Sequence, residues 1–323
     1  MKQSDNEQKR NQTFTYPNLV LLRFSEIAIK SPKTRKRFIK QLVDHIEHIL
    51  TLNKITNFEI IKEFSRIFVL SNSPETVSSL IANTVPGVVS TSIVYKCKTK
   101  LDEMKDIIDM KYLEIIQNHS TFAVRVKRTG KHSFSSMELG AIIGEFILEK
   151  SKDNPLKVDL TNPEYSLNLE VRDENTYIFD SITPGLGGLP AGCQGTVLVL
   201  VSGTEEDKSN IIKLYKRGAN TIVYSVKPME EINQEFLKSI EVLTSLQPML
   251  NSFRKKIFLP ADKLDIKHIL EFYKRNQCSG IGMSKELLEE LSELIPNSIP
   301  VFVPHLVTEI EHDVINRIIS SNE

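Results

Sequence analysis

Residues 196–226 read TVLVLVSGTEEDKSNIIKLYKRGANTIVYSV, and this stretch predicts the fold of the C-terminal part of the chain. It begins with six residues that are almost all apolar, a run typical of a strand buried inside a parallel sheet. A turn, a helix that ends before Gly218 and a second apolar run at 220–226 follow. Strand, helix and strand in this order form a βαβ unit, and apolar runs alternate with helical patterns downstream. Residues 196–323 are therefore predicted to be a Rossmann-like parallel α/β domain.

The segment before this stretch is rich in glycine and proline. Residues 181–195 read SITPGLGGLPAGCQG and hold five glycines and two prolines. Such a composition cannot sustain a helix or a central strand, so residues 183–195 are predicted to be a Gly/Pro linker or a structured loop. The glycines precede the strand instead of following it, which is the wrong place for a dinucleotide-binding fingerprint.

The N-terminal half of the chain is expected to hold two α+β domains. Residues 18–84 predict a strand, a helix that begins after Ser31 with Pro32 in its first turn, a strand pair and a second helix. Residues 85–182 predict a strand, a helix at 101–118, a second strand at 121–128, a further helix and two closing strands. In the strand at 121–128 the residues alternate, so its charged and apolar side chains point to opposite faces. The further helix opens with a capping-box pattern at Ser135 and Glu138.

Two clusters of basic residues stand out in a chain whose formal net charge is zero, with 41 basic and 41 acidic residues. The first lies around residues 30–40, with Glu26 as the one acid between residues 21 and 40, and the second lies at 125–132 and contains no acid. Two such clusters suggest a surface that binds a polyanion, with ordinary solvated surfaces as the alternative. Their members are Lys30, Lys33, Arg35, Lys36, Arg37 and Lys40 in the first cluster, and Arg125, Lys127, Arg128, Lys131 and His132 in the second.

Several classes of protein and site are disfavoured by the sequence. The three cysteines are widely spaced and form no CxxC pair, which argues against a zinc finger and a disulfide framework. No run approaches the length of an apolar membrane span, and residues 1–17 lack the apolar core of a signal peptide. These features predict a cytoplasmic chain with a disordered tail at 1–17 and no membrane partner. Cys193, Cys278, His268 and His305 have no accompanying catalytic set, so we expect no catalytic residue and no bound metal among them.

The turn after the first buried strand of the βαβ unit is where parallel sheets place their ligands. Ser202 and Gly203 open a helix there, and such a turn can bind phosphate through its backbone N–H groups. Three acids, Glu205, Glu206 and Asp207, occupy the first turn of the same helix. They suit the helix dipole but repel a phosphate at this position, unless Mg²⁺ bridges the two.

Four segments together resemble the ThiI-type tRNA sulfurtransferases, which make 4-thiouridine in tRNA. The segment FSEIAIKSPKTRKRFIKQL at 24–42 is similar to the N-terminal ferredoxin-like domain of that family. FAVRVKRTGKHSFSSMELGAIIGEFI at 122–147 and KVDLTNPEYSLNLEVRDENTYIF at 157–179 resemble its THUMP domain. GLGGLPAGCQGTVLVLVSG at 185–203 resembles the lead-in to its ATP-pyrophosphatase loop, the PP-loop. The resemblance implies a ferredoxin-like domain at 18–84 and a THUMP domain at 85–182.

In that family the first two domains grip tRNA, so the resemblance assigns RNA binding to both basic clusters. It also implies that the α/β domain is a PP-loop domain, whose loop reads SGGxDS in the family. Ser202 and Gly203 match that pattern, whereas Thr204, Glu206 and Asp207 replace a glycine, an aspartate and a serine. A Cβ then stands where backbone must approach phosphate, and a hydroxyl becomes an anion. We therefore expect a degenerate PP-loop, with Ser202 and Gly203 as its remaining nucleotide-binding residues.

The resemblance leaves three hypotheses for function. The favoured one is a tRNA-binding THUMP protein of the family that modifies position 8 of tRNA. It would need no cofactor and would act with a separate PP-loop or sulfur-transfer subunit, because the sulfur-carrying cysteines of the family are not matched. The alternative is an active ATP-dependent sulfurtransferase with a divergent loop, which would use ATP and Mg²⁺. A third is a structural or regulatory partner, and a homodimer is compatible with each.

Overall fold

The computed structural model describes residues 18–24, 26–63, 65–152, 155–247, 257–258 and 265–304. The tail predicted at 1–17 and His305 lie outside these residues. By their contacts the described residues form two compact units, of which one holds those within 18–21, 68–78 and 92–183 and the other holds those within 22–67, 79–91 and 184–304. Within the described ranges no helix is both long and apolar enough to cross a membrane.

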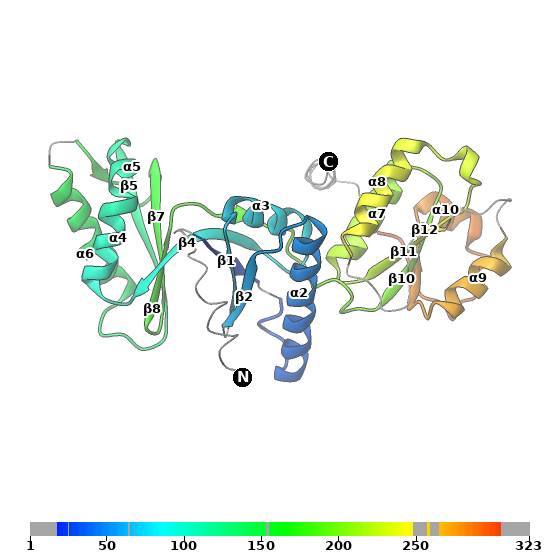
Figure 1. The fold of residues 1–323 in the computed structure, drawn as a ribbon. Helices are drawn as coiled ribbons and strands as arrows, with labels where there is room; N and C mark the ends of the chain where they lie inside the picture. The colour runs from blue at the N-terminus through cyan, green and yellow to red at the C-terminus, as the bar shows by residue number, and fades with distance from the viewer. Residues whose placement is uncertain are drawn as a thin grey trace, which may run out of the picture. The chain divides into compact units, whose positions relative to one another are not determined.

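The first half of the chain contributes a large mixed sheet, shown in Figure 1. Its strands follow the order β2-β3-β1-β4-β8-β7-β5-β6, and β9 pairs with β4. The parallel pairing of β5 with β7 and the antiparallel hairpin of β7 with β8 form the part with the THUMP-like sequence. The strand bounds are β1 Leu19–Arg23, β2 Phe58–Glu63, β3 Arg66–Ser71, β4 Ser90–Lys98, β5 Thr121–Thr129, β6 Lys157–Val158, β7 Tyr165–Arg172, β8 Asn175–Phe179 and β9 Thr183–Pro184.

The long helix α2 (Pro32–Leu52) begins where Ser31 and Pro32 predict. Its apolar face is buried as the sequence spacing predicts, because Phe38, Leu42, Ile46 and Ile49 are at most 3% exposed. The Ser31 side chain does not cap this helix, because its hydroxyl donates to the Thr34 hydroxyl and accepts from no backbone N–H. Helix α3 (Pro74–Thr84) follows the strand pair, also as predicted.

One helix of the THUMP part differs from the sequence prediction. The single helix expected at 101–118 is two helices, α4 (Leu101–Lys111) and α5 (Leu113–Gln117). They meet at Tyr112, whose φ of −123° lies outside the helical range. The Tyr112 side chain is buried, and its hydroxyl donates to the Ile178 carbonyl at 3.0 Å. Anchoring this aromatic ring in the core therefore accompanies the break, which apolar spacing does not reveal.

Helix α6 (Ser136–Lys150) begins with the predicted capping box. The Ser135 hydroxyl accepts from the Glu138 backbone N–H at 3.1 Å, and the Glu138 carboxylate accepts from the Ser135 N–H at 2.6 Å. Leu139, Ile143 and Ile147 of this helix are buried in the core.

The C-terminal part is a parallel α/β fold, as predicted, with strand order β12-β11-β10-β13-β14. Leu198 and Leu200 of β10 pack with residues of α9 and α10, such as Ile269 and Leu287. Figure 1 shows α7 and α8 along the other side of β10 and β11. The bounds are β10 Thr196–Val201, α7 Glu205–Lys216, β11 Asn220–Ser225, α8 Gln234–Ser245, β12 Ile257–Phe258, α9 Ile266–Arg275, β13 Gly280–Gly282, α10 Lys285–Leu291 and β14 Val301–Phe302.

The Gly/Pro run has fixed hydrogen-bond partners. Gly185 N donates to Val89 O and Gly187 N to Val88 O, each at 2.8 Å. Further along, Leu189 N donates to Lys216 O at 2.9 Å at the end of α7. A Cβ on Gly188 would lie 2.1 Å from the Lys216 carbonyl oxygen, and its φ is +74°, so this position requires glycine.

Candidate functional site

The first basic cluster lies on the turn before α2 and on its first three turns. Lys33, Lys36 and Arg37 are exposed, with the Arg37 guanidinium 5.2 Å from the centre of the Phe38 ring. Arg35 is half-buried and donates to the carbonyls of Ala28 at 2.7 Å and Lys30 at 3.3 Å. Its guanidinium therefore holds the preceding turn.

Lys40, at the end of this cluster, is exposed but has an acidic neighbour. Its ammonium group lies 2.5 Å from the Asp44 carboxylate one helical turn away. That hydrogen bond and charge raise the pKa of Lys40 above its ordinary value. Because Asp44 offsets its charge, Lys40 offers less to an anion than Lys33 or Lys36 does.

The second basic cluster lies on β5 and the turn that follows. The alternation predicted from the sequence is present: Arg125 and Lys127 are exposed, while Val124 and Val126 pack against the core. Arg128 and Lys131 are exposed as well.

Two members of this second cluster have local partners. Arg125 donates to the Leu160 carbonyl at 2.7 Å. A ring nitrogen of His132 lies 2.9 Å from the Thr129 carbonyl oxygen. Lys127, Arg128 and Lys131 therefore remain the cluster's most accessible cations.

The turn between β10 and α7 has the outline of an anion-binding loop. Gly203 has a φ of +95°, and the N–H groups of Ser202, Gly203 and Thr204 converge on one point. That point is occupied by the chain itself: Asp207 Oδ2 accepts from these three donors at 2.9, 3.0 and 2.9 Å. The Asp207 side chain is fully buried.

Two opposing effects act on the Asp207 carboxyl. Burial has the larger effect and raises the pKa of Asp207 above its ordinary value. The hydrogen bonds from the three loop N–H groups offset part of this rise, because they favour the charged form. The other two acids of this turn lie elsewhere: Glu205 pairs with Lys208 at 2.6 Å, and Glu206 accepts from Lys285 N at 3.4 Å. The sequence pattern does not distinguish the three acids, whereas in the structure Asp207 is the one of the three that accepts from the loop N–H groups.

The three cysteines lie in environments that favour the thiol. Cys193 and Cys278 are buried, and Cys97 is half-buried. Burial raises the pKa of Cys193 and Cys278 to about 11 each, and that of Cys97 to about 12. His268 lies 3.6 Å from the Asp265 carboxylate on an exposed part of α9. Within the part of the chain that the structure describes, no group of three His, Cys, Asp or Glu side chains is placed to hold a metal.

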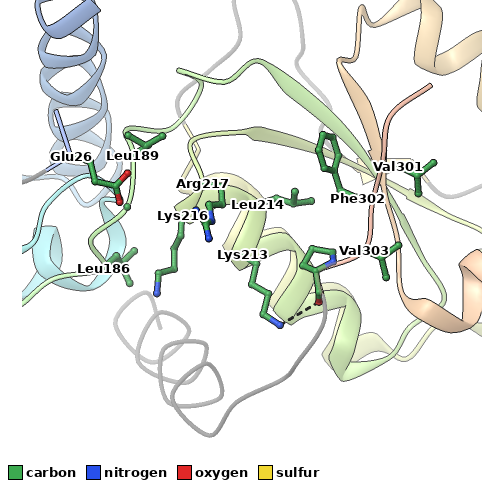
Figure 2. Close-up of a pocket in the computed structure, with 12 residues that line it drawn as sticks. Glu26, Leu186, Leu189, Lys213, Leu214, Lys216, Arg217, Val301, Phe302 and Val303 are labelled. Carbon is green, nitrogen blue, oxygen red and sulfur yellow. Dashed lines mark hydrogen bonds between the residues drawn. The ribbon is translucent and has the colours of Figure 1, made fainter. Parts of the chain in front are cut away.

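A cavity of about 820 Å³ lies at the C-terminal end of α7, away from the loop at its start. Figure 2 shows Lys213, Lys216 and Arg217 at this cavity, together with Glu26. The Lys213 ammonium donates to the Pro304 carbonyl at 3.4 Å. Sequence spacing did not predict this cavity, although the run KLYKRG at 213–218 carries its three cations within five residues.

Comparison with known families matches two segments of the chain. Residues 19–92 match the model of the ThiI ferredoxin-like domain, and residues 98–179 match the model of the THUMP domain. Each basic cluster falls inside one of these segments. The chain is also 30% identical to a probable tRNA sulfurtransferase of Mycoplasmopsis synoviae over 277 residues, which are 85% of this chain and 69% of that relative.

The chain belongs to the ThiI-type tRNA sulfurtransferase family. A second member, the probable tRNA sulfurtransferase of Methanosarcina mazei, is 29% identical over 320 residues, covering 89% of this chain and 78% of that protein. The chain spans 66% and 57% of two further archaeal members of the family.

Solved structures show the same fold as this family member. The protein PH1313 from Pyrococcus horikoshii superposes with a TM-score of 0.73 at 23% identity, covering 93% of this chain and 99% of that one. A 4-thiouridine synthetase, solved in complex with RNA and bound ATP, superposes with a TM-score of 0.68 at 19% identity, covering 94% and 85%. These matches confirm the ferredoxin-like, THUMP and parallel α/β architecture that the sequence predicts.

Proposed function

We propose that this chain binds tRNA in the cytoplasm through its two basic clusters and does not itself adenylate the RNA. The ferredoxin-like and THUMP domains hold the tRNA, and a separate catalytic subunit carries out the thiolation. The observation that supports tRNA binding is the exposure of Lys33, Lys36, Lys127 and Arg128 on the two segments that match the family models. The 4-thiouridine synthetase solved with RNA, which shares this fold, adds support.

Contacts between these cations and phosphates give an affinity that falls as salt rises, because counterions are released from the RNA. The shape of the RNA and its unpaired ends supply selectivity in such complexes. Filter binding of unmodified tRNA at increasing salt should therefore show a steep loss of affinity for the wild-type chain. Lys127→Ala with Arg128→Ala should weaken binding and reduce the salt slope by about one unit for each phosphate that the variant no longer neutralises.

Lys267→Ala with Lys274→Ala is the matched control, because it removes the same charge from exposed positions on α9. This control should bind tRNA as the wild-type chain does. Negligible wild-type binding at low salt would contradict the proposal and leave a structural or regulatory role. Equal losses in both double variants would show that net charge alone governs binding.

The proposed lack of adenylation is supported by the loop after β10. A nucleotide phosphate would need the N–H groups of Ser202, Gly203 and Thr204, and these already donate to Asp207. Calorimetric titration of ATP into the wild-type chain, with and without Mg²⁺, should give no binding heat. Micromolar binding would instead support the alternative, an active sulfurtransferase with ATP and Mg²⁺ as its cofactors.

The requirement for this chain in tRNA thiolation is tested in cells. Deleting its gene should remove 4-thiouridine from tRNA if the chain presents tRNA to a thiolating subunit, and mass spectrometry of digested tRNA measures the loss. Complementation with the Lys127→Ala, Arg128→Ala variant should restore less 4-thiouridine than complementation with the α9 control. Unchanged 4-thiouridine in the deletion strain would contradict a role in thiolation.

A further inference from the structure

The loop between β10 and α7 keeps the geometry of an oxyanion site. Three consecutive backbone N–H groups converge on one oxygen at 2.9 to 3.0 Å, an arrangement by which proteins bind phosphate and other anions. The loop also lies at the N-terminus of α7, a twelve-residue helix whose dipole adds positive potential at that point. The oxygen in this position belongs to Asp207, which is the third residue of the helix.

We propose that the Asp207 carboxylate is a built-in ligand that occupies this oxyanion site and closes it to phosphate. The carboxylate accepts the same N–H donors that a phosphate oxygen would, and it excludes a second anion by charge and by volume. The proposal concerns the loop itself and does not depend on whether the chain binds tRNA.

The surroundings of Asp207 support a site that retains its polar character. Ser202, Gly203 and Thr204 are half-buried, so an ion from solvent can reach the loop once the carboxylate is removed. Asn210, one turn further on the same face of α7, is fully buried. Neither polar atom of its side-chain amide has a hydrogen-bond partner among the described residues. A buried amide without such partners is unusual in a folded protein.

Hydrogen exchange on the full chain tests this contact directly. In the wild-type chain the amides of Ser202, Gly203 and Thr204 should exchange slowly, and inorganic phosphate should leave their rates unchanged. In Asp207→Ala the same amides lose their acceptor and should exchange at least about tenfold faster, since a hydrogen bond of about 1.4 kcal/mol corresponds to a tenfold change. Added inorganic phosphate should restore their protection in this variant.

The matched control is Glu205→Ala, which removes one carboxylate from the same helical turn but leaves the Asp207 contacts in place. Its loop amides should exchange as in the wild-type chain, with or without phosphate. Asp207→Asn provides a second variant of nearly unchanged volume, for use if the alanine variant does not fold. It removes the charge, and we expect its exchange rates to lie between those of the wild-type and alanine chains.

Calorimetry with inorganic phosphate gives the complementary measurement. Asp207→Ala should bind phosphate at least about tenfold more tightly than the wild-type chain does. Wild-type binding as tight as that of the variant would overturn the proposal, as would a folded Asp207→Ala chain whose loop amides stay protected without phosphate. Both results are independent of the tRNA measurements, so failure here and failure of the proposed tRNA binding can be told apart.

Discussion

Tyr215 shows how a single side chain joins distant segments of the chain. Its hydroxyl is fully buried and lies 3.1 Å from the Thr84 carbonyl, 3.3 Å from the Leu246 carbonyl and 2.9 Å from His45 Nε2. Burial raises the pKa of Tyr215 well above its ordinary value, so the hydroxyl keeps its proton and can donate. Segments from α2, α3, α7 and the end of α8 therefore share one polar cluster inside an apolar environment.

Replacing Tyr215 with Phe should lower the free energy of unfolding by about 1–3 kcal/mol, because a buried polar partner is then left unsatisfied. Urea denaturation followed by circular dichroism measures the change. Tyr224→Phe, on a half-buried tyrosine of β11, serves as the control and should cost less. Equal costs for the two variants would show that the Tyr215 hydroxyl contributes nothing beyond ordinary packing.

The cysteine thiols give a second prediction for single residues, because the thiolate is the reactive species. Cys193 and Cys278, whose pKa values burial raises to about 11, should react slowly with iodoacetamide at neutral pH. Between pH 7 and pH 9 their rates should rise about tenfold per unit, since the thiolate fraction grows with pH below the pKa. Mass spectrometry of the labelled chain measures the rates, and urea-unfolded chain provides the fast reference. Fast labelling of the folded chain at pH 7 would show thiols activated by a neighbouring group.

Among the elements, helix α6 has a start that can be tested by pH as well as by mutation. Ser135→Ala removes its N-cap and should cost about 0.5–2 kcal/mol in thermal or urea unfolding. Ser133→Ala, two residues earlier and outside the helix, should change stability little.

The Glu138 partner in this cap has a pH signature of its own. Hydrogen bonds from Ser135 lower the pKa of Glu138 below its ordinary 4.5. A lowered pKa means that the carboxylate stabilises the folded chain above pH 4.5, and that this contribution disappears as the pH falls through the lowered value. Glu138→Gln should therefore flatten the dependence of stability on pH between about pH 5 and pH 3. An unchanged acid limb in this variant would contradict the role of Glu138.

Elements with a strong periodic signal could be predicted from the sequence. The strand at 196–201 and the βαβ unit built on it match the structure, as do the buried face of α2 and the alternation along β5. These features depend on local apolar spacing, which the sequence records directly. The resemblance also predicted the family and the sheet architecture.

Other features depend on contacts that sequence spacing does not show. The break at Tyr112 follows from a side chain anchored to the distant β8, and helix α8 was not predicted at all. The sequence placed acids near the phosphate loop, but which acid bonds to the amides depends on the rotation of the first turn of α7. The cavity beside Lys213, Lys216 and Arg217 is assembled from segments far apart in the chain. The roles of both basic clusters in RNA binding stay predictions.

At the scale of the whole molecule, we expect local clusters of charge to govern polyanion binding more than the net charge does. The formal net charge is zero, yet the first cluster presents exposed cations at Lys33, Lys36 and Arg37. The chain should therefore be retained by heparin at low salt and neutral pH, because a polyanion interacts with local potential. Replacing these three residues with Ala should move elution to lower salt, and the α9 double variant should move it less. Passage of the wild-type chain without retention would contradict a polyanion-binding surface.

The glycine-rich stretch before β10 has a practical consequence for anyone dividing this chain. Its amides are tied to residues 88 and 89 on one side and to the end of α7 on the other, and Leu189, Pro190, Ala191 and Cys193 are buried. Proteases cut where the backbone can adopt an extended form. Because this glycine-rich segment is held by hydrogen bonds and is partly buried, it should resist digestion despite its composition. An excised α/β fragment that started at Thr196 would lack these buried residues, which pack at the end of α7.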